Sequence, residues 1–282
     1  MFRRKREGSV ICSSCGVLVG VNDDRCYNCG RRNPGLWGFA PALRAWGADL
    51  GFTPFAIGTC VLIYALTLLA SRGSVNMQAG FGFLSPSLYS LIAFGASGNV
   101  PVFIAGRWWT VLSASWLHAG LLHIFFNMWV LKQMGPITAD LYGPSRTVII
   151  YVISGVCGFT LSTLLGQYAA IPLLSHPGVT VGASAPIAGM IGAIFHYGKR
   201  GGSAMARSYA QQYIIAMVAY AFFFGGIDNA AHLGGFAGGY YAAVYLDPLK
   251  PERTDHAVMA LVCLVVSLGS VVVSVITGLQ YL

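Results

Sequence analysis

Residues 182–192 read GASAPIAGMIG and residues 228–239 read DNAAHLGGFAGG, and these two stretches are the most informative about the fold. Both are apolar and glycine-rich, a composition typical of transmembrane helices whose backbones pack closely together. Each also contains a polar residue, Ser184 or His232, of a kind that is costly to place in a bilayer and marks a functional site by default. The two stretches therefore predict neighbouring membrane helices that meet around a polar centre.

The composition of the whole chain excludes a soluble globule. Of the 282 residues, 56% are hydrophobic and only 9% are charged, whereas soluble domains carry about 25% charged residues. Apolar runs of about 20 residues, each long enough to cross a hydrocarbon core of about 30 Å, recur along most of the chain. We expect an all-α polytopic membrane protein with seven spans, at 52–71, 114–134, 147–168, 182–198, 209–226, 228–246 and 257–279.

The distribution of basic residues predicts the orientation of these spans. The chain has 17 lysines and arginines against nine acidic residues, for a formal net charge of +8. Nearly all of the basic residues precede the first span or fall in the loops on the same side, while Arg72 and Arg107 fall on the other side. The positive-inside rule then places the N-terminus in the cytoplasm. We expect a multi-pass protein of a bacterial inner membrane, in contact with the lipid bilayer and with no nucleic-acid partner.

Four regions follow from these patterns. Residues 1–35 are expected to form a cytoplasmic zinc-ribbon-like module, and residues 36–51 an interfacial linker with aromatic side chains at headgroup level. Residues 52–246 are expected to form a six-helix core, and residues 247–282 a loop and an additional C-terminal transmembrane helix. The long first external loop, 72–113, is nearly uncharged and rich in aromatic residues. It should fold onto the bundle, because irregular backbone is tolerated at membrane depth only against protein or water.

The N-terminal module contains two pairs of cysteines at the spacing of a metal site. Cys12 and Cys15 form one CxxC pair and Cys26 and Cys29 the other, and a glycine follows each pair. Two such pairs can close one tetrahedral Zn²⁺ site. The alternatives are two disulfides or free thiols, but disulfides rarely persist on the cytoplasmic side. We expect a structural Zn²⁺, which has no open coordination position, and no cofactor for catalysis.

Three predicted spans contain polar residues that loops do not explain. The second holds His118, His123 and Asn127, the fourth begins near Ser184, and the sixth holds His232. All three spans run inward from the external side, so His123, Asn127, Ser184 and His232 should share one depth in the outer half of the bilayer. A serine hydroxyl is a poor nucleophile without an adjacent base, and His232 could supply that base.

Further residues complete this hypothesis. Gly182, Gly235 and Gly239 would allow the close helix approach that a serine–histidine pair needs. His123 and Asn127 lie four residues apart on one helix face and could stabilise an oxyanion. His118 is expected to hold the external loop by hydrogen bonds. Asp228 precedes His232 by one turn, but it falls at the wet end of the span and we do not expect it to act as a triad acid.

Each of these features also has an ordinary structural interpretation. A serine in a membrane helix commonly bonds a backbone carbonyl, a buried histidine is often a packing residue, and glycines alone indicate only tight packing. The conjunction of all three features at one depth favours the catalytic interpretation. A channel or transporter is less consistent with the sequence, because no internal repeat or pathway of paired charges is present.

The order of the motifs resembles that of the rhomboid family of intramembrane serine proteases. The motifs are HxxxxHxxxN over 118–127, GASA over 182–185 and AHxxGxxxG over 231–239. The resemblance implies a six-helix core with Ser184 as nucleophile and His232 as general base, and with His123 and Asn127 helping to form the oxyanion hole. The helix at 257–279 resembles the additional C-terminal helix of some members, and the cysteine-rich head is an accessory module.

The sequence departs from the family pattern at three points. Thr110 follows Trp109 where members often have arginine, so that arginine is absent or displaced to Arg107. Ala185 replaces the more usual glycine after the nucleophile. Ala188 stands where members often carry an aromatic residue that packs on the catalytic histidine, so Phe236 or Tyr240 would have to take that role.

The expected function is that of a hydrolase: a serine endopeptidase that cleaves transmembrane segments of membrane proteins with a Ser184–His232 dyad. The resemblance also implies substrates whose helices are weakened near the cleavage site. The alternative is a catalytically inactive rhomboid-like protein that binds membrane clients. A cytoplasmic partner of the zinc module is a further expectation, and the substrate itself is not encoded in the sequence.

Overall fold

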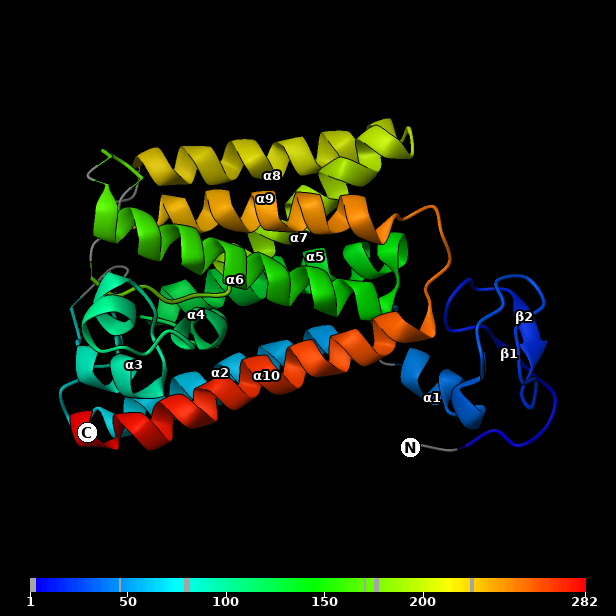
Figure 1. The fold of residues 1–282 in the computed structure, drawn as a ribbon, viewed down its shortest axis with the longest axis horizontal. Coiled ribbons are helices and arrows are strands. Elements are labelled where there is room, and N and C mark those ends of the chain that lie inside the picture. The colour runs from blue at the N-terminus through cyan, green and yellow to red at the C-terminus, as the bar shows by residue number, and fades with distance from the viewer. Residues whose placement is uncertain (1–3, 46, 79–81, 170, 175–177, 224–225) are drawn as a thin grey trace.

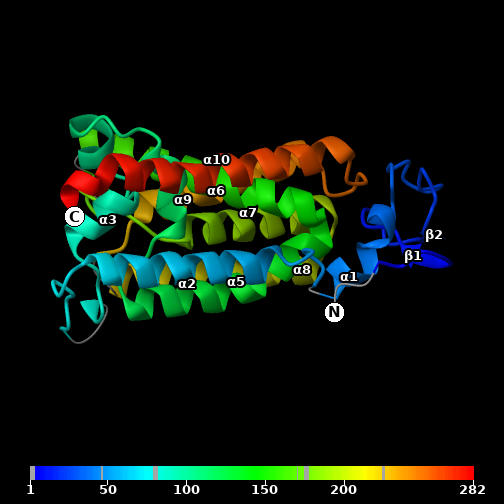
Figure 2. The ribbon, with the colours of Figure 1, turned by 90° about the horizontal axis from the view of Figure 1, so that it is seen from below.

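The chain forms a bundle of long helices with a small module at one end, as Figure 1 and the perpendicular view in Figure 2 show. This computed structural model describes residues 4–45, 47–78, 82–169, 171–174, 178–223 and 226–282. The C-terminus lies at the end of the bundle opposite the module (Figure 1). The described residues therefore agree with an all-α membrane domain that carries a separate N-terminal head.

The described residues include a long helix at each of the seven predicted positions. These helices have 17 to 25 residues and are α2 (Phe52–Ala70), α5 (Leu121–Tyr142), α6 (Pro144–Tyr168), α7 (Ser184–Arg200), α8 (Ala204–Phe223), α9 (Asn229–Leu246) and α10 (Thr254–Gly278).

Length and apolar composition alone identify fewer spans. Among the described residues, three helices are long and apolar enough to cross a membrane, namely Phe52–Ala70, Pro144–Tyr168 and Thr254–Tyr281. A bent pair, Thr110–Trp116 with Leu121–Tyr142, would raise the number to four. Helices α7, α8 and α9 are not among these spans, because they are short or because glycine, alanine and polar residues lower their mean hydropathy.

The second predicted span differs from the structure at its beginning. The sequence predicts one helix over 114–134, but α5 starts at Leu121, and the short α4 (Thr110–Ser113) and η4 (Ala114–Trp116) precede it at an angle of 88°. The helix breaks because the backbone at Leu117 and Gly120 is extended. His118 therefore lies in the bend and not within the membrane helix, which corrects the expected placement.

Glycines bring the backbones of α7 and α9 into direct contact. A Cβ atom at Gly239 would overlap the backbone of Gly189, and one at Gly235 would overlap the carbonyl of Ala185. Gly158 of α6 lies against the same contact, because a Cβ atom there would overlap the side chain of Ala185 and the carbonyl oxygen of Ala231. The predicted close approach of the two glycine-rich stretches is thus a feature of the fold, with α6 as the third member.

The long loop at 72–113 folds onto the bundle in its described parts, as predicted. Its described parts form α3 (Leu88–Phe94) and the π-helical turn η3 (Val100–Ile104), followed by α4. Arg107 is buried and donates hydrogen bonds to the carbonyl oxygens of Ile92 in α3 and Ser274 in α10. The loop is therefore joined to the additional C-terminal helix, which lies along one side of the bundle (Figure 1).

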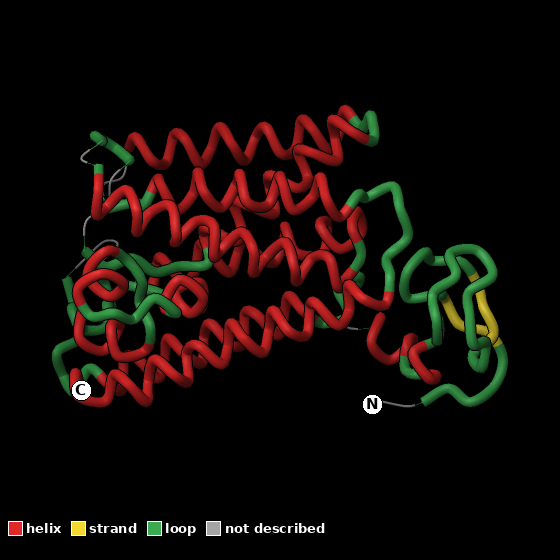
Figure 3. The backbone as a smooth tube through the Cα atoms, viewed as in Figure 1, coloured by secondary structure: helices red, strands yellow, loops and turns green. Residues whose placement is uncertain are grey.

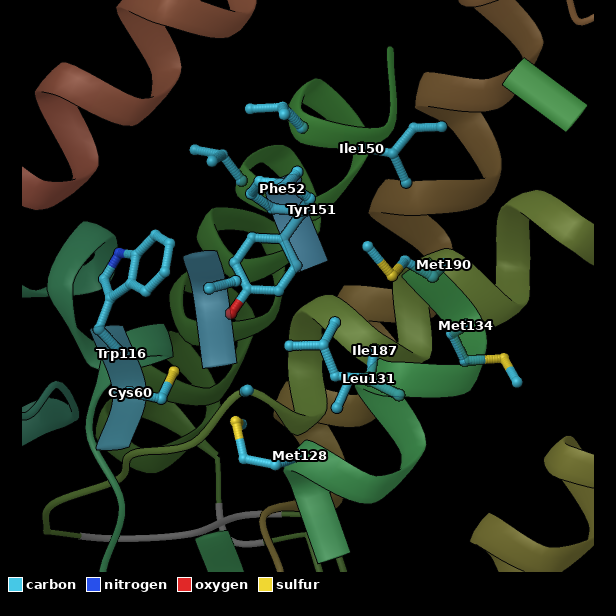
Figure 4. Packing of buried hydrophobic residues seen from close by; sticks show 14 of the residues in the cluster. Phe52, Cys60, Trp116, Met128, Leu131, Met134, Ile150, Tyr151, Ile187 and Met190 are labelled. Carbon is cyan, nitrogen blue, oxygen red and sulfur yellow. The ribbon is translucent and has the colours of Figure 1, made fainter. Parts of the chain in front are cut away.

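The hydrophobic core lies where these helices converge. Trp116 and Tyr151 are fully buried, and the ring of Tyr151 packs edge-on against Phe52 (Figure 4). Cys60 lies in the same cluster and is also buried, as expected for a cysteine that serves only in packing. Side chains from α2, α5, α6 and α7 therefore fix the position of the helix that begins at Ser184.

The N-terminal module is the part of the described chain that contains strands (Figure 3). The strands β1 (Ser9–Ile11) and β2 (Leu18–Gly20) pair antiparallel. Residues 36–51 contain the turn η1 (Leu36–Gly38) and the short helix α1 (Ala40–Arg44), and the ring of Trp37 is exposed. The chain ends in the turn η5 (Leu279–Tyr281).

Candidate active site

Ser184 is the first residue of α7, and its side chain is partly exposed. The preceding Gly182 has a φ of +135°, in a region that L side chains rarely adopt, and its N–H donates to the carbonyl oxygen of Ala114 at 3.0 Å. This turn starts the helix at the serine. The first N–H groups of a helix have no acceptor within that helix, so those of α7 are available beside the Ser184 hydroxyl.

His123 of α5 lies against the same turn. A Cβ atom at Gly182 would lie 2.7 Å from His123 Nε2 and 3.5 Å from Ser184 Oγ, so the histidine ring and the hydroxyl flank one glycine. The backbone N–H of Ala119 donates to His123 Nδ1 at 3.3 Å. Because Nδ1 accepts a hydrogen bond, the neutral ring carries its proton on Nε2, on the side of Gly182. Only glycine fits between the two side chains.

Asn127 is buried one turn further along α5, and its Nδ2 donates to the carbonyl oxygen of His123 at 2.9 Å. The acceptor is a carbonyl, so the atom facing it must be the amide nitrogen. This bond uses one of the two N–H groups and supports the backbone that carries His123.

His232 lies one turn into α9 and is partly exposed. Its neighbours Ala231 and Gly235 form the face of α9 that contacts Gly158 and Ala185. Because Ala185 directly follows Ser184, His232 lies at the edge of the contact between the two helices. Ser184 and His232 make no hydrogen bond with each other in the described structure. Catalytic hydrogen bonds are often long or poorly aligned in structures without substrate.

His118 differs from the expectation for its role. It is fully buried, and neither ring nitrogen has a hydrogen-bond partner within the described residues. Its ring packs edge-on against His123, with centroids 5.2 Å apart. The expected hydrogen bonds to the external loop are not found in the described part of the chain, and the visible contact of His118 is with the site.

The residues expected to compensate for Ala188 lie in two different places. Phe236 is one turn after His232 and lines the same cavity as that histidine. The ring of Tyr240 packs against His196 and Phe195, further along the helices towards the module end. Of these two candidates, Phe236 therefore shares an environment with His232.

A cavity of about 370 Å³ opens beside His232. Its walls come from α8, from α9 and from the segment before α7, and they are almost entirely apolar. His232 and Asn229 are the polar residues among its lining side chains, which also include Leu173, Met217, Phe222 and Leu233. An apolar cavity with one titratable group is suited to an apolar chain rather than to a hydrated solute.

Asp228 takes part in a polar network that the sequence did not predict. It is the N-cap of α9, and its Oδ1 accepts from the N–H of Ala231 at 2.9 Å. Its Oδ2 accepts from the hydroxyls of Ser162 in α6 and Thr180, the latter at 2.7 Å. Both carboxylate oxygens are thus engaged by partners other than the His232 ring.

Comparison with known proteins now gives the family. A family model described as the Rhomboid domain matches residues 105–248, which include the bend, Ser184 and His232. The chain belongs to the rhomboid family. The match covers just over half of the chain and excludes the cysteine module.

Individual rhomboids support this assignment. The chain is 28% identical over 217 residues to "Rhomboid protease GluP" of Bacillus subtilis, covering 76% of this chain and 38% of that protein. It is 31% identical over 181 residues to "RHOMBOID-like protein 1" of Arabidopsis thaliana, covering 63% and 44%. It is also 28% identical over 179 residues to "Inactive RHOMBOID-like protein 8" of the same plant, covering 60% and 46%. The chain spans less than half the length of these relatives, which include both a protease and an inactive protein.

The cysteines of this rhomboid's head form a second candidate site. The Sγ atoms of Cys12, Cys15, Cys26 and Cys29 all lie within 4.8 Å of one another. The sulfurs of Cys12 and Cys29 are 3.8 Å apart, and those of Cys15 and Cys26 are 3.6 Å apart. Sulfurs at about 2.3 Å from a tetrahedral zinc would be separated by about 3.8 Å, whereas a disulfide requires about 2.0 Å. The cluster thus has the dimensions of a metal site.

The backbone around the cysteines supports the same conclusion. Gly16 and Gly30 have φ values of +76° and +71°, and each donates its N–H to the carbonyl oxygen of the first cysteine of its pair. Both glycines therefore form tight turns at the cysteine pairs. Although burial opposes it, hydrogen bonding from the Val17 backbone and the Asn28 side chain lowers the pKa of Cys15 to about 7, whereas burial raises the pKa of Cys12 and Cys29. Cys15 is therefore the thiol most disposed to the thiolate form that binds metals.

Proposed function

We propose that this chain is an intramembrane serine endopeptidase that cleaves transmembrane segments of membrane proteins. Its family membership and the protease among its relatives support this proposal. The observation that carries it is the backbone contact between Gly235 and Ala185, which brings the segments of His232 and Ser184 together, with His232 lining an apolar cavity. A membrane-embedded site of this kind gives a substrate helix lateral access from the bilayer.

In the proposed reaction, Ser184 Oγ attacks the carbonyl carbon of the scissile peptide bond while His232 takes the hydroxyl proton. The C–N bond of the tetrahedral intermediate then breaks, and His232 returns the proton to the leaving amine. Water attacks the resulting acyl-enzyme with His232 again as base, which releases the carboxylic acid and restores Ser184. Each step conserves atoms and needs no cofactor.

The oxyanion of the intermediate would be stabilised by donors at the start of α7. His123 Nε2 carries a proton and lies beside Gly182, and the backbone N–H groups of Ser184 and Ala185 at the start of α7 would act with it. Asn127 would act with them through its second N–H. A single preorganised donor of this type contributes about 10² to 10³ in kcat.

The cysteine module is proposed to hold one structural Zn²⁺ on Cys12, Cys15, Cys26 and Cys29. Four cysteines leave no open coordination position, so the metal would fix the fold of the head and take no part in proteolysis. We propose the boundaries 1–35 for this module, 36–51 for the linker, 52–246 for the catalytic core and 247–282 for the loop and additional helix.

The proposed orientation places the head in the cytoplasm of a bacterial cell with the core in its inner membrane. Basic residues cluster at the head end of the bundle, among them Arg146, Arg200 and Lys250, which favours that end as cytoplasmic. Ser14 and Arg31 of the module bind Glu252 of the same chain, and a cytoplasmic partner of the module stays a proposal.

The alternative is an inactive rhomboid that binds membrane clients, as the name of one relative illustrates. Cleavage of labelled single-span substrates in proteoliposomes separates the two functions. Ser184→Ala and His232→Ala should each abolish cleavage, with a loss of at least about 10³-fold, and Ser208→Ala on the exposed face of α8 should leave it unchanged. Cleavage that persists in Ser184→Ala would overturn the proposed nucleophile.

A further inference from the structure

One carboxylate connects the segments that carry the two proposed catalytic residues. Asp228 Oδ2 accepts the Thr180 hydroxyl at 2.7 Å. Thr180 precedes Ser184 by four residues and Asp228 precedes His232 by four residues. The bond therefore joins the chain at matching positions just before α7 and at the start of α9.

Both ends of this bond are held by further contacts. The backbone of Thr180 forms two hydrogen bonds with Ser97, at 2.8 and 3.0 Å, and its side chain is buried. Asp228 caps α9 through the N–H of Ala231 and also accepts the hydroxyl of Ser162, which is fully buried in α6. A change in the relative position of the two segments would break bonds to a carboxylate, and such bonds are about twice as strong as neutral ones.

From this arrangement we infer that Asp228 and Thr180 are positioning residues that set the distance between Ser184 and His232. The inference rests on the proposed function, because it assigns a role within that reaction. Neither residue touches the reacting atoms. The glycine contact between α7 and α9 brings the helices together, and the Thr180–Asp228 bond fixes the turns from which the serine and the histidine project.

The inference predicts a defect in the chemical step and not in substrate binding. A displacement of about 1 Å at a catalytic group can reduce the rate by up to about 10²-fold. We expect Thr180→Val, which keeps the side-chain shape and removes the hydroxyl, to lower kcat by about tenfold or more with KM unchanged. Asp228→Asn should have a similar effect, because its amide nitrogen cannot accept the two hydroxyls.

A conservative variant and a matched control separate positioning from loss of structure. Thr180→Ser restores a hydroxyl at the same place and should recover most of kcat. Thr163→Val removes a buried threonine hydroxyl from the same region, but that hydroxyl faces Ser97 and not Asp228, so kcat should stay within about twofold of wild type. If Thr180→Val fails to fold in detergent, Ser162→Ala tests the other hydroxyl on the carboxylate.

The experiment measures kcat and KM for a transmembrane substrate in proteoliposomes, with the thermal midpoint of each variant recorded alongside. A fall in kcat for Thr180→Val or Ser162→Ala, with rescue by Thr180→Ser, supports the inference. Unchanged kcat, or a change confined to KM, overturns it while leaving the proposed function intact. If wild type neither cleaves substrate nor reacts with a serine-directed probe, the proposed function itself fails and the inference falls with it.

Discussion

Arg31 and Glu252 form an ion pair that is buried between the cysteine module and the membrane domain. Arg31 Nη1 and Glu252 Oε2 are 3.2 Å apart, and only 6% and 1% of the two side chains is exposed. The other carboxylate oxygen of Glu252 accepts the N–H groups of Ser145 and Arg146 at the start of α6. Ser14 donates to the Glu252 backbone carbonyl at 2.7 Å. One residue of the α9–α10 loop thus joins the head to the start of α6.

Removal of one partner of this pair should destabilise the protein strongly. Glu252→Ala leaves the Arg31 guanidinium and two N–H groups buried without an acceptor, and breaking a buried pair in this way costs about 3 to 5 kcal/mol. Thermal unfolding in detergent should show a lower midpoint. The matched control is Asp255→Ala, which breaks the exposed Arg253–Asp255 pair and should cost at most about 1 kcal/mol. Equal midpoints for the two variants would argue against a docked head.

The zinc proposal predicts about one metal atom per chain. The double variant Cys12→Ser/Cys15→Ser removes two of the four ligands and should lose the zinc measured by elemental analysis of the purified protein. Cys263→Ser changes a cysteine of α10 that lies outside the cluster and should retain it. Zinc content that does not fall in the double variant would reject the site.

The glycine contact between α7 and α9 predicts a selective effect of added methyl groups. A Cβ atom at Gly239 would overlap the Gly189 backbone, so Gly239→Ala should force the helices apart at a cost of about 1 to 3 kcal/mol. Gly269→Ala on α10 meets nothing within 4 Å and should be neutral or slightly stabilising, since alanine favours the helix. Chemical denaturation in mixed micelles measures both, and a neutral Gly239→Ala would contradict the packing.

Arg107 predicts that the additional helix is integral to the fold. Its guanidinium donates to carbonyl oxygens of α3 and α10, and the neighbouring Trp109 indole donates to the Ser274 hydroxyl at 3.1 Å. Arg107→Met removes the guanidinium donor from carbonyls that keep one local hydrogen bond each, and each lost bond to a charged group is worth about 1.5 to 3 kcal/mol. Limited proteolysis should then release α10 faster than in wild type. Arg72→Met changes an exposed arginine and serves as the control; equal release rates would contradict this role.

Motifs formed by residues close together in the chain could be predicted from the sequence, whereas polar contacts between distant residues could not. The CxxC pairs and the glycine stretches of α7 and α9 were recognisable because each rests on spacing within a few residues. The bend before α5 was missed because the apolar run continues through it and the break depends on extended backbone at Leu117 and Gly120. Apolar content gives no signal for such a break.

The contacts of Asp228 and Glu252 were missed for a different reason. Thr180 is 48 residues from Asp228 in sequence, and Arg31 is 221 residues from Glu252. Neither pair belongs to a local motif, so a single sequence carries no pattern that links its members. Asp228 could be recognised only as a helix N-cap candidate, since an acidic residue one turn before an apolar helix commonly takes that position.

The most direct test of the central claim is the reaction of a fluorophosphonate probe with the reconstituted protein, with the labelled residue identified by mass spectrometry. A serine that is activated by a nearby base reacts with such a probe, whereas an ordinary membrane serine does not. The Ser184–His232 dyad predicts labelling at Ser184 in wild type and its loss in Ser184→Ala and in His232→Ala. Labelling at another residue, no labelling of folded wild type, or undiminished labelling of Ser184 in His232→Ala would contradict the Ser184–His232 dyad.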